Sequence, residues 1–575
     1  MAYLYRSLPE SMIRLLVLLP GQFDDPIRCE IIEAKFSSDL EITPSYEALS
    51  YVWGSQTTRL PAFIVDSDGT PCGTIGLGSN LYVALQHLRR EQLNRVLWCD
   101  FVCINQVDLR ERAREVARMG EVYSKAERAV IWLGPERDEN VPYSQQEVQA
   151  IKALFARNWF KRLWVRQEVI LAKSSVVIAG NHQVSWMHFV SAAAFMDSFI
   201  RLRNRGKYDI DFGRSVFNVF ELGCLVTYQG VLDIMHACRA CECSDDRDRI
   251  YALLGLLSVH HTFIIQPDYS KPIKKVYRDL MLEYARSQGS LDVLTLCEDA
   301  EKPSWVPDLH KLGLNTGLNT RVVQYCRASG EAAAFFSLSD DNAMETYGVR
   351  CGVLGRRMLH SISKNSPPEV LKQAITRVLR KYMGDNISQW DEARLETLTK
   401  GLLGCLWRER TGRKNHSSIY FALSELKSWA LESASDVSDE VPAKSESLIL
   451  INHIARVLFH GDSCRWTQDG HLGLGFHGCE EGDLLYAILG CRRLIALRKE
   501  TAEVKFKHKD GLAQWQDPRL QDVALPPGWR ESQDHAGYPY WFRMGSDNKR
   551  SYFDPRLTPE ELKKRNINLE RLVIV

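Results

Sequence analysis

Short apolar segments alternate with amphipathic ones over the first third of the chain. Six of the apolar segments have the length of buried strands. They lie at 13–19, 28–34, 46–53, 96–104, 128–133 and 176–179. Apolar residues recur at helical spacing between them, at about 80–91, 108–126 and 145–172. This alternation predicts an α/β fold over residues 1–185, with a mainly parallel sheet flanked by helices.

The pattern changes twice further along the chain. From 186 to 432, Leu, Phe and Ala recur at three- and four-residue spacing, which predicts a mostly helical region. Residues 433–447 are polar and acidic, so we expect a disordered linker there. Short alternating segments with glycine turns then predict a small β unit at 448–510, followed by a separate C-terminal element at 511–575.

Composition narrows the class of protein. The 575 residues are 45% hydrophobic and 25% charged, as in ordinary globular proteins, and the formal net charge is only +1. We therefore expect no nucleic-acid partner, and no apolar run approaches the ~18–20 residues of a membrane helix. The 15 cysteines are scattered, which favours a reduced, cytoplasmic setting. Cys238 and Cys241 have ligand spacing without a second pair at zinc-finger distance, so no metal site is expected.

Polar residues gather where two of the predicted strands end. Since the carboxyl ends of parallel strands meet at one edge of a sheet, these residues are candidate ligand contacts. They are Ser50, Tyr51, Trp53 and Gly54 after one strand and Asp100, Asn105 and Gln106 after another.

Structural roles are the alternatives for the same residues. Trp53 and Gly54 also suit a core aromatic followed by a turn. The loop with Asn105 leads into a helix for which Asp108 is a good N-cap, with Glu111 at the capping-box position.

One carboxylate stands out as a catalytic candidate. Trp164-Val-Arg-Gln-Glu168 places Trp164 and Glu168 one turn apart on the same helical face, where both can line one site. The alternative is that Glu168 forms an ion pair with Lys161, Arg162 or Arg166, or caps a neighbouring loop.

Several of these segments together resemble one family. They are Tyr46-Glu-Ala-Leu-Ser-Tyr-Val-Trp-Gly54, the segment from Leu97 to Asp108, Trp164–Glu168, Asp245–Gly255, Pro267-Asp-Tyr269 and Pro303–Asp308. The chain resembles fungal heterokaryon-incompatibility (HET) domain proteins, with a motif core at 46–185. That core is similar to Toll/interleukin-receptor (TIR) domains, some of which cleave NAD with a glutamate in a Trp-x-x-x-Glu setting.

The resemblance implies a role for each candidate residue. Glu168 would be the catalytic carboxylate and NAD a substrate rather than a bound cofactor. The loops at Ser50–Gly54 and Asp100–Gln106, together with Trp164, would flank the dinucleotide.

The resemblance also implies a function in non-self recognition, in which fusion of incompatible cells triggers programmed cell death. Two mechanisms stay open. In the first the domain is an NAD glycohydrolase completed by homo-oligomeric assembly. In the second it is a catalytically inert adaptor that acts through self-association and protein partners of incompatibility signalling.

The C-terminal element carries a second, weaker resemblance. Leu525-Pro-Pro-Gly-Trp529 and Tyr540-Trp541-Phe542 resemble a WW domain over 525–557, with Trp529, Trp541 and Pro555 in the buckle of its three-stranded sheet. On the opposite face, Tyr540, Phe542, Met544 and Tyr552 would form a peptide-binding surface. Tyr552 replaces the signature tryptophan and Met544 the usual histidine, so packing within the chain is the alternative to peptide binding.

Overall fold

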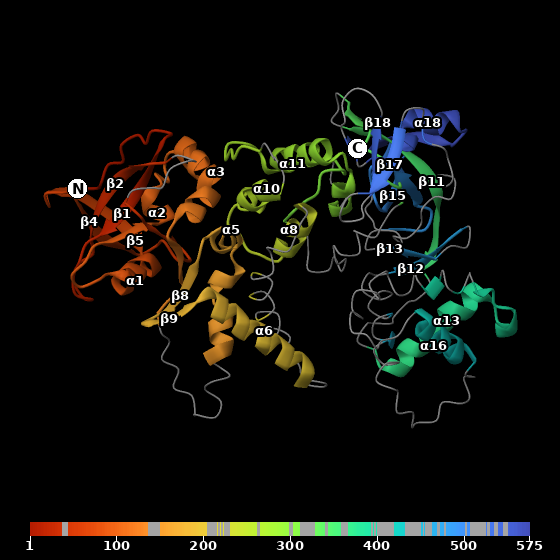
Figure 1. Ribbon diagram of the computed structural model, residues 1–575, viewed down its shortest axis with the longest axis horizontal. Coiled ribbons are helices and arrows are strands. Elements are labelled where there is room, and N and C mark those ends of the chain that lie inside the picture. Colours follow the sequence, from red (N-terminus) through yellow and green to blue (C-terminus); the bar gives the residue numbers. More distant parts are fainter. Residues whose placement is uncertain are drawn as a thin grey trace. The chain divides into compact units, whose positions relative to one another are not determined.

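The computed structural model divides into two compact units, Met1–Val276 and Tyr277–Val575 (Figure 1). The residues that it describes are 1–36, 44–135, 150–203, 216, 219, 222, 231–260, 265–297, 303–310, 328–339, 343–357, 366–392, 395, 398–399, 419–431, 450–451, 454, 463–468, 472–475, 479–500, 503–506, 525, 529–533, 539–543, 550–551 and 553–574. The predicted linker at 433–447 lies outside them, and the predicted domain boundaries stay predictions.

The first unit is built on a nine-stranded sheet. Its strands, in the order in which they lie, are β5 (Pro71–Gly78), β4 (Arg59–Val65), β2 (Arg28–Lys35), β1 (Met12–Leu18), β6 (Arg95–Trp98), β3 (Glu47–Ser50), β7 (Arg128–Trp132), β8 (Ser175–Ala179) and β9 (His182–Ser185). All six predicted apolar segments contribute a strand. The α/β class is therefore confirmed.

The sheet is mixed, with four parallel and four antiparallel pairings, so the expectation of a mainly parallel sheet is wrong, although β2 and β4 also pair parallel. Strands β6, β3, β7 and β8 are parallel neighbours, but β1 is antiparallel to both β2 and β6. Strands β5 and β9 pair antiparallel with their neighbours at the two edges. A fully buried strand reads as an apolar run whichever direction its neighbours take, so the pattern of β1 carries no information on its direction.

Strands β4, β5 and β9 were missed for a different reason. Their residues are largely exposed or half-buried, so no continuous apolar run marks them. Edge and near-edge strands are commonly short of apolar side chains because one face or one edge meets water.

Helices α1 (Ser79–Leu88) and α3 (Leu109–Lys125) confirm two of the predicted helices. The third predicted stretch breaks into a helical segment at 150–155, the 3-10 helix η1 (Asn158–Lys161) and the short α5 (Val165–Ile170). The other described helices of the unit are α2 (Asp100–Cys103), α6 (Trp186–Arg203), α8 (Val231–Cys238), α9 (Asp248–Tyr251) and α10 (Leu254–His260).

Helices α3, α5 and α10 lie side by side next to the sheet (Figure 1). Two glycines allow this approach: a Cβ on Gly120 of α3 would lie 3.0 Å from the Cα of Gly255 in α10 and 2.8 Å from Leu171 Cδ1. Because Leu171 immediately follows α5, the crossing fixes the helix that carries Glu168.

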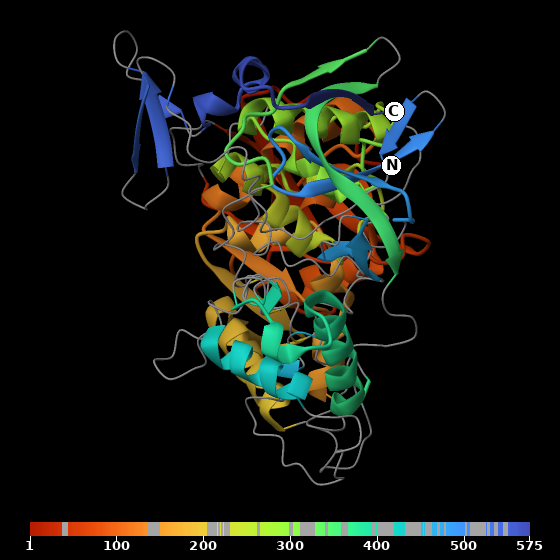
Figure 2. The same cartoon turned by 90° about the vertical axis from the view of Figure 1, so that its right-hand side faces the viewer.

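The second unit contains a larger β component than the sequence predicted. Strands β10 (Phe336–Leu338) and β11 (Met344–Arg357) lie within the region expected to be mostly helical. They join β12 (Ser463–Thr467), β13 (Leu472–Gly475), β14 (Leu484–Ile488), β15 (Leu494–Glu500), β16 (Glu503–Phe506) and β20 (Leu569–Ile574) in one sheet. Strand β11, the long curved green strand of Figure 2, pairs with β12, β14 and β20. The small β unit at 448–510 thus shares its sheet with strands from both sides in sequence.

The described helices of this unit are α11 (Ile273–Gln288), which contains the boundary, η3 (Asp292–Leu296), α13 (Pro368–Met383), η4 (Ile387–Gln389), α16 (Ile419–Leu431), η6 (Pro555–Leu557) and α18 (Pro559–Lys564). Helices α13 and α16 pack through buried apolar side chains that include Ile375 and Leu426.

The C-terminal segment contains a three-stranded antiparallel sheet, as the WW resemblance implied. Its strands are β17 (Trp529–Gln533), β18 (Pro539–Arg543) and β19 (Arg550–Ser551), in that order. The register pairs Trp529 with Arg543 and Glu531 with Trp541.

Candidate functional site

The candidate residues after β3 and β6 meet at one edge of the sheet. The two strands are parallel, with Ala48 opposite Trp98, so Ser50 at the end of β3 and Asp100 just after β6 lie at the same edge. Carboxyl ends of parallel strands are where open α/β sheets bind ligands. The geometry therefore brings together the two strand-end loops that the sequence singled out.

Glu168 of α5 reaches the same edge and is almost completely buried, with 2% of its surface exposed. Its Oε2 accepts a hydrogen bond from the hydroxyl of Ser50, which is itself 1% exposed. The Ser50 oxygen in turn accepts a hydrogen bond from the indole nitrogen of Trp159 at 2.8 Å. Residues 50, 159 and 168 thus form a chain of hydrogen bonds, which we call the glutamate cluster.

The charge of Glu168 is poorly compensated. Burial is the main cause that raises its pKa from the usual 4.5 to about 7, and the nearby carboxylate of Asp100 raises it further. The positive charge of Arg162 and the Ser50 hydrogen bond oppose this shift. Among the residues that the structure describes, no ion pair holds Glu168, so a large share of it is protonated at neutral pH.

In the described part of the chain, Arg162 is held by a contact with the backbone and has no carboxylate in an ion pair with it. Its guanidinium donates a hydrogen bond to the backbone oxygen of Tyr51, directly after β3. From there its charge lowers the pKa of both Glu168 and Asp100. One cation therefore faces two carboxylates at this edge.

Asp100 is held by the Trp53 loop. The indole nitrogen of Trp53 donates to Asp100 Oδ2 at 2.8 Å, and burial raises the pKa of this carboxyl. The Trp53 ring meets Phe101 edge-on, 5.3 Å between centroids, so the loop is packed and not free. Gly54 follows with a φ of +66°, which agrees with a turn.

Trp164 makes its polar contact away from the glutamate cluster. Its indole nitrogen donates to Asp248 Oδ2 at 3.1 Å, and the Tyr269 hydroxyl donates to the other oxygen of Asp248 at 2.6 Å. Burial raises the pKa of Asp248 to about 6. The segments Asp245–Gly255 and Pro267–Tyr269 thus support the helix that carries Glu168.

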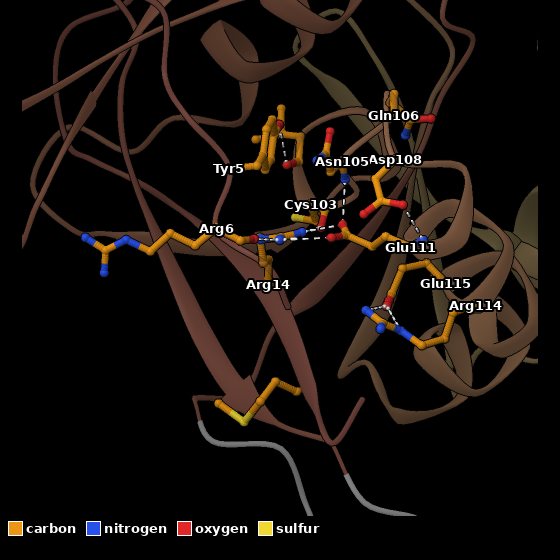
Figure 3. A network of polar contacts seen from close by, with 12 residues as sticks. Tyr5, Arg6, Arg14, Cys103, Asn105, Gln106, Asp108, Glu111, Arg114 and Glu115 are labelled. Atoms are coloured by element: carbon orange, nitrogen blue, oxygen red, sulfur yellow. Dashed lines mark hydrogen bonds and ion pairs between the residues drawn. The ribbon is translucent and has the colours of Figure 1, made fainter. Parts of the chain in front are cut away.

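Asn105 and Gln106 make hydrogen bonds within the segment that joins β6 to α3 and with the first turn of α3. The Asn105 backbone N–H donates to Glu111 Oε1 at 2.7 Å, and the Gln106 side chain donates to the backbone oxygen of Asp100 at 2.8 Å. Figure 3 shows Asn105 beside Glu111, whose carboxylate faces Arg14. Asp108 caps α3 as predicted, accepting from the N–H groups of residues 110 and 111. Glu111, however, does not close a capping box, because Arg14 and Asn105 occupy its oxygens.

The cysteine segment forms a packed helix end. Cys238 and Cys241 are buried, and Arg166 Nε donates to the Cys241 sulfur at 3.3 Å. The hydrogen bond between Cys241 and Cys238 is the main cause that lowers the pKa of Cys241 to about 6. The charge and the hydrogen bond of Arg166 lower this pKa further. Within the described ranges, no three Cys, His, Asp or Glu side chains are grouped so as to hold a metal ion.

The predicted peptide-binding surface is only partly visible. Tyr540 and Phe542 lie in β18, whereas Met544 and Tyr552 lie outside the described residues. Pro555 begins η6, whose Leu557 is buried with Leu562 in the core of the second unit. Arg556 forms an ion pair with Glu531 of β17 at 3.5 Å. These contacts tie the three-stranded sheet to its own unit.

Sequence reasoning missed three residues of this region: Trp159, Arg162 as a residue facing two carboxylates, and Asp248. Arg162 was considered only as an ion-pair partner of Glu168. Trp159 lies in a Trp-Phe pair that reads as core, and the Phe160 ring does pack against Phe155 and Phe189. Its polar role depends on a contact 109 positions away along the chain, and no local spacing signals that.

Comparison with known proteins shows which proteins this part of the chain is similar to. Residues 46–152 match the family model described as Heterokaryon incompatibility protein (HET). The match includes β3, β6 and β7 with Ser50 and Asp100, and it ends before Glu168.

A particular relative is Heterokaryon incompatibility protein 6, OR allele, of Neurospora crassa. The two chains are 28% identical over 398 aligned residues, covering 52% of this chain and 58% of the relative. The chain thus spans little more than half the length of that relative. No solved structure matches this chain. In the part of the chain that the structure describes, no helix combines the length and apolarity needed to cross a membrane.

Proposed function

We propose that this protein acts in heterokaryon incompatibility and that its first unit hydrolyses NAD at Glu168. The HET match and the Neurospora crassa relative support the biological role. The observation that carries the enzymatic part is a buried carboxylate without an ion pair among the described residues, close to the carboxyl ends of the parallel strands β3 and β6.

The chemistry needs one carboxylate and no general acid. Nicotinamide leaves NAD as a neutral ring when its bond to the ribose anomeric carbon breaks. A positive charge then develops on the ribose, and an ionised Glu168 stabilises it before water attacks the same carbon. The products are ADP-ribose, nicotinamide and a proton.

The neighbouring residues have supporting roles in this reaction. Arg162 stabilises the ionised form of Glu168. Trp53 offers an aromatic plate next to Asp100, where the dinucleotide lies along the strand ends. Because Glu168 is 2% exposed, substrate reaches it only after the residues that cover it move. We assign this opening of the site to the assembly of several copies of the protein.

An inert adaptor is the second candidate function, and the same burial favours it. A carboxylate closed off from solvent serves a scaffold as well as an enzyme. In that case the protein signals by self-association and by recruiting protein partners that lead to cell death.

The test is NAD turnover by the full chain, alone and fused to a dimerising coiled coil. Loss of NAD with equimolar nicotinamide release is expected, and Glu168→Gln should reduce it by at least about a hundredfold. Glu121→Gln, on the exposed side of α3, is the matched control and should keep full turnover. Absence of turnover in a folded, assembled sample would favour the adaptor.

A further inference from the structure

Trp159 is buried in the first unit and makes one directed polar contact. It is 1% exposed in η1, and its ring packs against Phe160 and Trp186 at centroid distances of 5.1 and 6.0 Å. Its indole nitrogen donates to Ser50 Oγ at 2.8 Å. An indole nitrogen is a donor only, so the direction of this hydrogen bond is certain.

The direction of that bond constrains the next one. Ser50 has a single hydroxyl proton, and its oxygen already accepts from Trp159. The proton is therefore available to Glu168 Oε2, the oxygen within hydrogen-bond distance. A donor on a carboxylate favours the ionised form of that carboxylate.

We propose that Trp159 is a positioning residue that acts through Ser50: it directs the Ser50 proton to Oε2 of Glu168 and so leaves Oε1 as the acceptor for the ligand. A ligand that suits such an acceptor carries hydroxyl donors, as the diol of a ribose does. The inference rests on the proposed function of Glu168 and deepens it by assigning which oxygen the substrate meets.

Other groups around Glu168 act on its charge independently of Trp159. Arg162 lowers its pKa and Asp100 raises it. Tyr123 of α3 also lies close enough for the charge of Glu168 to raise the Tyr123 pKa. Replacing Trp159 leaves these three groups in place, so the change measures the hydrogen-bond chain alone.

The experiment uses Trp159→Phe in the full chain, with Trp186→Phe as its matched control. Both variants remove an indole from the same aromatic cluster, and only Trp159 donates to Ser50. The first readout is the pH dependence of NAD turnover. The second is the carboxylic-acid infrared band of Glu168 between pH 6 and 9, followed in protein with ¹³C-labelled glutamate and assigned by its loss in Glu168→Gln.

In Trp159→Phe the midpoint of both curves should rise by about one pH unit, which lowers turnover about tenfold at pH 6. Ser50→Ala should give a shift at least as large. Adding Trp159→Phe to Ser50→Ala should change nothing further, because the two residues act in series.

The two outcomes that matter are separable. If wild-type protein shows no NAD turnover, the proposed function fails, but the infrared titration still reports on the chain of hydrogen bonds. If Trp159→Phe moves the Glu168 midpoint no more than Trp186→Phe does, or if its shift adds to that of Ser50→Ala, the positioning role is wrong.

Discussion

Two buried glutamates in the first unit are held in opposite ways. Glu111 accepts two hydrogen bonds from Arg14, at 2.5 and 3.1 Å, and a third from the Asn105 backbone. Among the described residues, Glu168 accepts one hydrogen bond, from the neutral hydroxyl of Ser50, and Arg162 acts on it through its charge. Both side chains are at most 5% exposed.

The difference separates a structural carboxylate from a candidate functional one. A buried charge with a bidentate partner joins β1 to α3 and leaves no capacity for a ligand. A buried carboxyl without an ion pair has a raised pKa and opposes folding when it ionises. Such an unfavourable group is expected at sites that trade stability for function.

The largest expected effect is on the Glu111 side of this comparison. Arg14→Met leaves Glu111 buried without its counter-charge, which should cost about 3–5 kcal/mol of stability. Hydrogen exchange of the β1 and α3 amides in urea measures this loss within the first unit. Arg114→Met, on the half-exposed partner of Glu115, should cost less than about 1 kcal/mol. If the two variants lose the same stability, the buried ion pair of Glu111 is no more important for the fold than a half-exposed one.

Replacing Glu168 should have the opposite sign. Its pKa is about 7 in the folded protein against an ordinary value of 4.5, so the folded state holds this proton more tightly. The contribution of this proton to the stability of the fold is therefore fully present below about pH 4.5 and is lost as the pH rises through 7. Glu168→Gln removes the titration and should stabilise the protein by about 1–3 kcal/mol at pH 8, with little change at pH 5. Thermal unfolding at both pH values measures the change, with Glu121→Gln as the control. If Glu168→Gln is destabilised at pH 8, Glu168 is a structural carboxylate like Glu111.

At the close contact between Gly120 of α3 and Gly255 of α10 we expect an effect on stability of similar size. A Cβ at Gly120 meets Leu171 and the backbone of Gly255, so Gly120→Ala should cost about 1–3 kcal/mol although alanine favours helices. Ala117→Ser, at an exposed position of the same helix, is the control and should be nearly neutral. Exchange of the α5 amides measures whether the strain reaches the helix of Glu168. Unchanged protection would mean that α5 is held by other contacts.

The smallest effect is expected at Asn105. Its side chain accepts one long hydrogen bond, 3.3 Å from the Val107 N–H, whereas its contact with Glu111 uses the backbone. Asn105→Ala should therefore cost about 0.5 kcal/mol and leave NAD turnover within about twofold. A large loss of turnover with normal stability would instead show that Asn105 contacts the ligand, as the strand-end position first indicated.

Local patterning was sufficient for the elements with a continuous apolar run or an apolar helical face. The central strands, α1, α3 and the Asp108 cap follow from periodicity and from one side chain that bonds the backbone next to it. The meeting of Ser50 and Asp100 at one edge also followed, since the carboxyl ends of parallel strands share an edge of the sheet. Strands β4, β5 and β9 did not follow, because their exposed residues lack the apolar pattern.

The partners of the site were decided by contacts between residues far apart in sequence. Trp164 and Glu168 share a helical spacing, yet one meets Asp248 and the other Ser50, because the segments that fill the space around α5 come from positions 84 and 118 residues away. Likewise β11 pairs with β20 across more than 200 residues. Periodicity encodes which face of an element is apolar, but hydrogen-bond partners and pKa values depend on what packs against that face, and only the folded chain determines this.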